Sequence, residues 1–198
     1  MRLLNEYLSN KIKQSRIIPA TKFDIKLILK DELKRLGNDA DLNHIDVSGC
    51  SDLSDVFYYK DDFCGDISKW NVSNCINFNS MFYRCEKFNC DISEWDVNKG
   101  KMFIGMFERC SIFDCDLNNW DMRNAVDISG MFRVCEKFNQ PLDKWNVSHV
   151  KFMNEMFLGC ENFNQDISNW DTKNTIDHHK MFENCLIDYE YMPKFLDI

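Results

Sequence analysis

A strict 25-residue period constrains this chain more than any other feature. The five tryptophans share one register, at Trp70, Trp95, Trp120, Trp145 and Trp170. The pair Met-Phe recurs with the same period, from Met81-Phe82 to Met181-Phe182, and no insertion or deletion breaks the count between Ile45 and Cys185. A constant repeat length is typical of stacked coils, because each residue then lies against its counterpart in the next coil.

The repeat divides the chain into three parts. Residues 1–44 precede it and residues 195–198 follow it. Between them lie six units, which are 45–69, 70–94, 95–119, 120–144, 145–169 and 170–194. We predict one α/β domain, a solenoid in which every unit is one coil with a short parallel strand and a short helix.

Both elements are inferred from local patterns. The segment Asp-Ile-Ser-x-Trp-Asp-Val alternates weakly and contains β-branched and aromatic residues, which predicts the strand. The segment that leads to Met-Phe-x-x-Cys has apolar residues three and four apart, which share one helical face and predict the helix. In the second unit these residues are Phe78, Met81, Phe82 and Cys85.

The phenylalanine of each Met-Phe pair and the cysteine three residues later are predicted to face the core. These two structural ladders are Phe82, Cys85, Phe107, Cys110, Phe132, Cys135, Phe157, Cys160, Phe182 and Cys185. Free cysteine behaves as a small apolar residue, and no Cys-x-x-Cys pair indicates a zinc site. Cys90 and Cys115 share a different register, at a spacing open to a disulfide, but we expect free thiols in a reducing compartment.

Asparagines that precede the predicted strand form another ladder. Asn89, Asn139 and Asn164 stand in one register, with Asp114 as a variant. We expect these side chains to bond main-chain groups of the neighbouring coil.

Residues 1–44 are predicted to form a helical cap on the first coil. Thr21 and Asp24 resemble a capping box, and a helix then runs to about Leu36 and ends at Gly37. The apolar face of that helix is Ile25, Ile28, Leu29, Leu33 and Leu36. An earlier amphipathic helix is predicted from Leu3, Leu4, Tyr7, Leu8 and Ile12. Met192, Pro193 and Phe195 are expected to close the other end.

Charge and composition exclude several functions. The net charge of −8 argues against direct nucleic-acid binding and suits a partner with a basic surface. The sequence has no signal-peptide pattern and no apolar run of membrane-spanning length, so we expect a cytoplasmic protein, monomeric alone. It also has only seven glycines and no nucleophile–base or phosphate-binding motif. We therefore expect no enzyme activity, no cofactor and no metal.

The unit WNVSHVKFMNEMFLGCENFNQDISN resembles the BspA-like leucine-rich-repeat family, whose units follow W-D-V-S-N-V-T-N-M-S-x-M-F-x-x-C-x-x-F-N-Q-D-I-S. The resemblance covers about residues 45–185. It implies a right-handed solenoid and a role in protein binding, and many members of that family are surface proteins implicated in adhesion. The family has no catalytic residues, so the resemblance transfers none.

A partner-binding surface is predicted on the strand face and its flanking turns, where side chains vary on a constant frame. The candidates are Asp66, Ser68, Trp70, Asp91, Ser93, Trp95, Asp116, Asn118, Trp120, Asp143, Trp145, Asp166, Ser168 and Trp170. The tryptophans either fill the edge of the core, which we favour, or stand exposed as binding anchors. The acidic row either serves solubility and turn formation, which we favour, or attracts a basic partner.

We therefore expect a non-enzymatic module that binds another protein. One alternative is an intracellular inhibitor, encoded by a phage or mobile element, that blocks a host defence nuclease through its acidic surface. The other alternative is an adhesin-like surface protein without its export signal.

Overall fold

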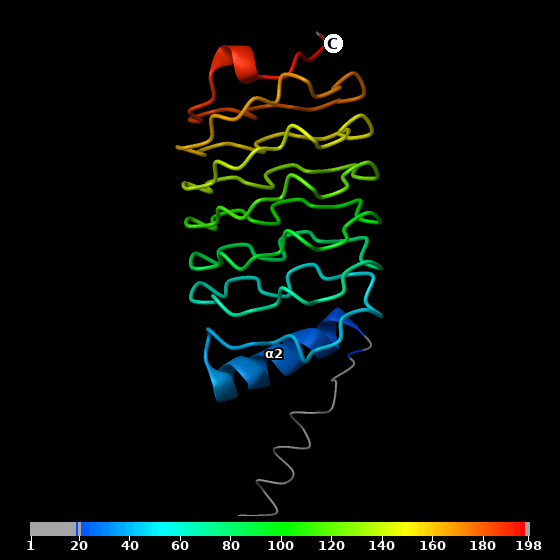
Figure 1. Cartoon of the computed structure of the whole chain (residues 1–198), viewed down its shortest axis with the longest axis vertical. Helices are drawn as coiled ribbons and strands as arrows, with labels where there is room; N and C mark the ends of the chain where they lie inside the picture. Colours follow the sequence, from blue (N-terminus) through cyan, green and yellow to red (C-terminus); the bar gives the residue numbers. More distant parts are fainter. Residues whose placement is uncertain (1–18, 20, 197–198) are drawn as a thin grey trace, which may run out of the picture.

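The repeat units form successive coils of a single stack. A computed structural model describes residues 19 and 21–196, and Figure 1 shows their coils one above another, with helix α2 against the first coil. The regular helices of this described part are α2 (Lys22–Leu36) and the 3-10 helix η1 (Tyr189–Tyr191). No described helix has the length and apolarity needed to cross a membrane.

Main-chain hydrogen bonds join each coil to the next at a constant offset. The N–H of Phe78 donates to Met102 O at 2.8 Å, and the N–H of Phe82 donates to Met106 O at 2.9 Å. The N–H of Lys101 returns a bond to Ile76 O at 2.9 Å. Across the stack these bonds span 24 to 26 residues, as the 25-residue period requires.

The strand predicted in every unit does not form in the described units. Parallel pairing occurs as single bridges just before Met-Phe, at Asp52↔Asn77, Asn77↔Met102, Met102↔Asp127, Asp127↔Phe152 and Phe152↔Asp177. Only one described bridge, Asp41↔Asp66, falls in the Asp-Ile-Ser segment. The coils are too corrugated for longer strands, because turns follow one another along each coil.

The short helix predicted in every unit is also absent from the described units. The segment from Phe78 to Cys85 instead makes two consecutive turns, closed by Met81 N–H to Phe78 O at 3.2 Å and Cys85 N–H to Phe82 O at 2.9 Å. The third residue of each turn has a positive φ, 53° at Ser80 and 58° at Arg84, as type II turns require.

Two consecutive type II turns place apolar side chains at the same spacing as a helix does. Each turn spans four residues, so side chains three and four apart still reach the same side. The N–H groups at Phe78, Ser80, Phe82 and Arg84 point to the next coil, whereas in a helix they would bond within the coil. Bonding between coils therefore replaces bonding within a helix.

Stacked aromatic rings fill the core. Phe82 lies 5.6 Å from Phe107 in the next coil, with planes 3° apart, and 4.0 Å from Phe88 in its own coil. The same contacts recur along the stack, and nearly all these rings are fully buried. Burying one such side chain stabilises the fold by about 1.5–3 kcal/mol.

Helix α2 covers the start of the stack, although Leu36 of its predicted apolar face is 41 % exposed. Its capping box joins Thr21 and Asp24, and the N–H of Gly37 donates to Leu33 O at 3.0 Å. Ile25 and Leu29 are fully buried in the common core. The earlier helix predicted from Leu3, Leu4, Tyr7, Leu8 and Ile12 lies outside the described residues.

The last residues cover half of the final coil. Tyr191 O accepts the N–H of Ile167 at 3.0 Å, and Lys194 O accepts the hydroxyl of Thr172 at 2.6 Å. Met192 and Phe195 pack against the core, and Pro193 is buried. The tail therefore continues the bonding between coils up to Lys194, the residue before Phe195, which stands 25 residues after Trp170.

Gly130→Ala tests the left-handed turn positions. Gly130 has φ 59°, and an added Cβ would meet nothing closer than 3.9 Å, so the substitution isolates backbone strain. We expect the free energy of unfolding to fall by about 1 kcal/mol, measured by urea denaturation. The matched control is Gly49→Ala, which has open space and no positive φ and should be neutral or slightly stabilising. Equal effects at both glycines would contradict the type II turns.

Candidate functional site

The tryptophans of the predicted binding surface are buried. Trp70, Trp95, Trp120, Trp145 and Trp170 are between 2 and 4 % exposed. The indole N–H of Trp120 donates to Ile92 O in the preceding coil at 3.1 Å, and the other four make the same bond. The indoles of Trp95 and Trp120 stack 6.5 Å apart. These side chains fill the core edge and offer no anchor to a partner.

The acidic row of the predicted surface forms the corner of each coil. Asp91 Oδ1 accepts the N–H of Ser93 at 3.0 Å, and Asp166 Oδ1 accepts that of Ser168 at 3.0 Å. Asp66 and Asp116 make the same turn with Ser68 and Asn118. The carboxylates of Asp91, Asp116 and Asp166 belong to exposed residues, so the row is a charged edge as well as a structural corner.

Hydrogen bonding lowers the pKa values of three members of this row. Bonds from Ser93 lower the pKa of Asp91, and bonds from Ser168 lower the pKa of Asp166. Bonds from Ser68 likewise lower the pKa of Asp66. Asp143 departs from the pattern because Pro141 takes the acidic position, and its Oδ1 accepts from Asn118 Nδ2 at 2.9 Å.

A cluster of tyrosines and arginines, which the sequence analysis missed, lies on another side of the stack. It occupies the two variable positions of Met-Phe-x-x-Cys in the first three units. We define the Tyr–Arg surface as Tyr58, Tyr59, Tyr83, Arg84 and Arg109. The signal was present, because these positions vary between constant neighbours and hold three of the six tyrosines in the chain.

The three tyrosines contact one another while remaining accessible. The rings of Tyr58 and Tyr83 stack 4.8 Å apart across the coil boundary, and Tyr59 lies 5.3 Å from Tyr83. Tyr58 and Tyr59 are 43 and 49 % exposed. The guanidinium of Arg84 lies 4.9 Å from the centre of the Tyr59 ring, within cation–π distance.

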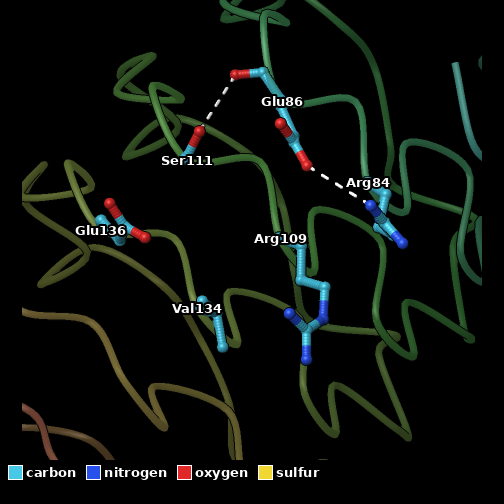
Figure 2. A pocket seen from close by; sticks show the side chains of 6 residues that line it. All are labelled: Arg84, Glu86, Arg109, Ser111, Val134 and Glu136. Atoms are coloured by element: carbon cyan, nitrogen blue, oxygen red, sulfur yellow. Dashed lines mark hydrogen bonds and ion pairs between the residues drawn. The ribbon is translucent and has the colours of Figure 1, made fainter. Parts of the chain in front are cut away.

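Next to these rings the coils enclose an open hollow. Figure 2 shows Arg84 and Arg109 on one side of it, Glu86 and Ser111 on another, and Val134 and Glu136 opposite. Arg84 reaches the carboxylate of Glu86 at 3.6 Å. The hollow therefore presents both charge signs.

Arg133 contributes no free charge to this region. Its guanidinium reaches Glu108 at 2.8 Å and Glu155 at 3.1 Å. Burial raises the pKa of Glu108 despite this contact. Arg84 and Arg109, each more than a third exposed, are thus the accessible cations of the Tyr–Arg surface.

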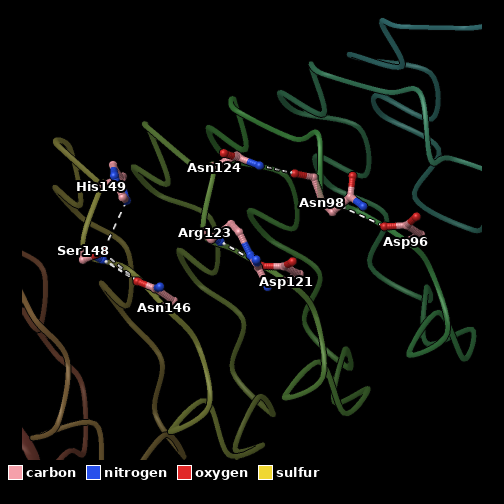
Figure 3. A network of polar contacts seen from close by, with 8 residues as sticks. All are labelled: Asp96, Asn98, Asp121, Arg123, Asn124, Asn146, Ser148 and His149. Atoms are coloured by element: carbon pink, nitrogen blue, oxygen red, sulfur yellow. Dashed lines mark hydrogen bonds and ion pairs between the residues drawn. The ribbon is translucent and has the colours of Figure 1, made fainter.

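The polar corners that follow the tryptophans are structural. Figure 3 shows Asp96 and Asp121, which accept the N–H groups of Asn98 and Arg123 at 3.1 and 3.2 Å, and Asn124, whose Nδ2 donates to Asn98 O at 2.7 Å. The predicted asparagine ladder is confirmed on another corner. There Asn139 Oδ1 accepts from the N–H of Asn164 at 3.0 Å.

The thiols of the structural ladder are buried donors. Cys110 Sγ donates to Phe82 O at 3.0 Å, and Cys135 and Cys160 repeat this contact. Burial raises the pKa of the Cys85 thiol to about 12, and it also raises the pKa values of Cys110, Cys135 and Cys160 well above the ordinary thiol value.

The thiols of Cys90 and Cys115 are free in the structure. Cys90 Sγ lies 3.7 Å from Asp66 Oδ1, and Cys115 Sγ lies 3.7 Å from Asp91 Oδ1. Among the described residues, no three His, Cys, Asp or Glu side chains converge on a common point.

Comparison with known proteins gives one family. The family model described as "Mycoplasma protein of unknown function, DUF285" matches residues 29–133 and, again, residues 112–187. The two matches overlap and together span the whole series from Trp70 to Cys185. No curated protein and no solved structure is detectably similar to the chain.

Trp120→Phe tests the structural role of the indole column. The smaller ring leaves Ile92 O without its donor inside the core, which costs about 1–3 kcal/mol in addition to lost packing. Urea denaturation measures the change. An unchanged free energy of unfolding would show that the indole does not bond this carbonyl.

Thiol labelling tests the cysteine ladder. Under native conditions iodoacetamide should modify the exposed Cys64 first and leave Cys110, Cys135 and Cys160 unmodified, because burial holds their pKa values far above neutrality. Mass spectrometry after brief labelling distinguishes the sites, and labelling in urea is the control. Native modification of the three buried thiols would contradict the ladder.

Proposed function

This chain belongs to the DUF285 family of Mycoplasma proteins of unknown function, and we propose that it is a non-enzymatic module that binds another protein through the Tyr–Arg surface. The observation that carries the proposal is the exposed cluster of Tyr58, Tyr59 and Tyr83 with Arg84 on the Tyr59 ring. Tyrosine and arginine are the residues most enriched, with tryptophan, among those that dominate binding energies.

The architecture is proposed to be a right-handed solenoid of the leucine-rich-repeat kind. The parallel bridges and the constant bond offsets between coils support a solenoid. The resemblance of the units to the BspA-like family supports the leucine-rich-repeat assignment and the protein-binding role. In such a stack, the frame is constant and variable positions display side chains to a partner.

The Tyr–Arg surface suits a binding role better than the surface predicted from sequence. Its rings already contact one another, so little side-chain freedom is lost when a partner packs on them. The corresponding positions in later coils change to Leu158-Gly159 and Glu183-Asn184, so the aromatic character is local. Because the aromatic residues are confined to the first coils, they favour one defined contact with a partner. A feature that every repeat needs for its structure would recur in all coils.

The acidic row supports a second, electrostatic contact. Asp91, Asp116 and Asp166 are exposed along one edge, and hydrogen bonds lower the pKa values of Asp91 and Asp166. A basic partner, including a nuclease whose nucleic-acid groove is basic, would meet complementary charge there. Binding at this edge would weaken steeply with added salt.

Substitution on each surface tests the proposal. The partner is first captured from the native cell with a photo-crosslinking residue at position 59 and identified by mass spectrometry, then purified. We expect Tyr59→Ala and Arg84→Ala each to weaken its affinity by about 1–2 kcal/mol, or roughly 5–30-fold, in calorimetry.

The controls decide between the surfaces. Ile76→Ala removes a comparably exposed apolar side chain, beside the bridge from Asn77 to Met102, and should leave the affinity unchanged. Asp91→Asn and Asp116→Asn probe the acidic row. A partner whose affinity falls with these two substitutions and not with Tyr59→Ala would contradict the Tyr–Arg surface and favour the electrostatic contact.

A further inference from the structure

In the final coil, four main-chain donors have no acceptor among the described residues. In the coil before it, the N–H groups of Met153, Glu155, Phe157 and Gly159 donate to Asp177, His179, Met181 and Glu183 at 2.8–2.9 Å. Their counterparts in the final coil are the N–H groups of His178, Lys180, Phe182 and Asn184. Within residues 19 and 21–196, none of these four has an acceptor.

Side chains at this end of the stack are also less buried than their counterparts in earlier coils. Phe182 stacks on Phe157 at 5.9 Å, as in every other coil, but it is partly exposed where its counterparts are fully buried. Cys185 is likewise only partly buried. The tail that covers the rest of the coil runs over Ile167 and Thr172 and ends beside His178, whose ring lies 3.8 Å from that of Phe195. No residue of the described tail donates to or accepts from the main chain of Lys180, Phe182 and Asn184 on that side of the coil.

The first coil carries the complementary groups. The carbonyls of Asp52, Ser54, Val56 and Tyr58 stand where later coils accept, and no N–H among the described residues donates to them. Each of these carbonyls occupies the same place in its repeat as the carbonyl that would accept from one of the open donors in a further coil. The two ends of the stack therefore match in register.

Helix α2 prevents a second copy from using that match. Its Lys22 reaches Ser54 Oγ at 2.6 Å and Asp52 at 3.0 Å, so it lies over the carbonyl row. Ser54 and Val56 are both buried. Two final coils facing each other would oppose donor to donor.

An extended peptide does not fit the open row either. The donors span two turns, each of which brings residues three apart to within about 7 Å. A regular strand advances about 10 Å over the same three steps, so it would lose register after the first bonds. Only a coil with the same corrugation presents carbonyls at the required spacing.

We propose that the open end of the final coil docks the uncovered first coil of another polypeptide built from the same 25-residue repeat. The contact would continue the interface that already joins each coil to the next, with four main-chain bonds and a partner ring on Phe182. A hollow beside the row, lined by Ile176, His178, Phe195 and Leu196, receives a side chain of that coil. Helix α2 makes this chain a terminal subunit, because its own first coil is covered.

Hydrogen exchange on the unmodified protein gives the first test. The amides of His178, Lys180, Phe182 and Asn184 should exchange at nearly unprotected rates, and those of Met153, Glu155, Phe157 and Gly159 at least about 100-fold more slowly. Protection of the four final-coil amides in the monomer would overturn the proposal, whatever the behaviour of any variant.

A full-length probe with an uncovered first coil gives the second test. Ile25→Asp with Leu29→Asp places two charges in the contact of α2, which should lift the helix and expose the carbonyl row. In sedimentation velocity we expect this probe to bind the unmodified chain one to one and to assemble end to end by itself, while the unmodified chain stays monomeric. If the near-UV circular dichroism of the probe shows that its coils unfold, Leu29→Asp alone replaces it.

Substitution at the open end identifies the contact. Phe182→Glu in the unmodified chain should weaken binding of the probe at least about tenfold and restore rapid exchange of the four amides in the mixture. Ile112→Glu adds the same charge away from both ends and should change neither result. Self-association of the unmodified chain, failure of the folded probe to bind, or insensitivity to Phe182→Glu would each overturn the proposal.

Discussion

The structure depends on one constraint, the in-register hydrogen bonding of each coil to the next. A main-chain donor in one coil finds its acceptor in the next coil at a fixed offset, and slipping the register by one position would misplace all the bonds of that coil together. The same register stacks Phe82 on Phe107. It also brings the Cys110 thiol to the carbonyl of Phe82. Core packing and main-chain bonding are thus satisfied by one geometry, which explains the absence of any insertion between Ile45 and Cys185.

A coil without regular secondary structure must satisfy its polar groups in other ways. Side chains do so here at every corner. The indole of Trp120 and the thiol of Cys110 donate to buried carbonyls, Asp91 accepts an N–H in its own turn, and Asn139 accepts one from the neighbouring coil. Residue types that suggest chemistry in a sequence, such as a row of cysteines or carboxylates, are used here to pair main-chain groups.

In this fold, the positions that maintain the stack differ from the positions that are free to contact a partner. The Trp, Met-Phe and Cys positions recur from coil to coil, whereas the two positions before each cysteine change from tyrosine to arginine, leucine or glycine. The Tyr–Arg surface is formed by these variable positions on the side of the stack. The end of the stack offers a different kind of contact, because its open donors would recognise the repeat geometry itself and not a particular side chain.

The sequence by itself determined the repeat, its register, the buried ladders of Phe82 and Cys85, and the helix from Thr21 to Gly37. These follow from spacing and capping, which are local. Only the tertiary structure decided that Phe78 to Cys85 forms two type II turns, because turns and a helix share the same apolar spacing and the choice rests on acceptors in the next coil. For the same reason the bond from the Trp120 indole to Ile92 O, and the meeting of Tyr58 with Tyr83 from separate coils, became visible only once the coils were stacked.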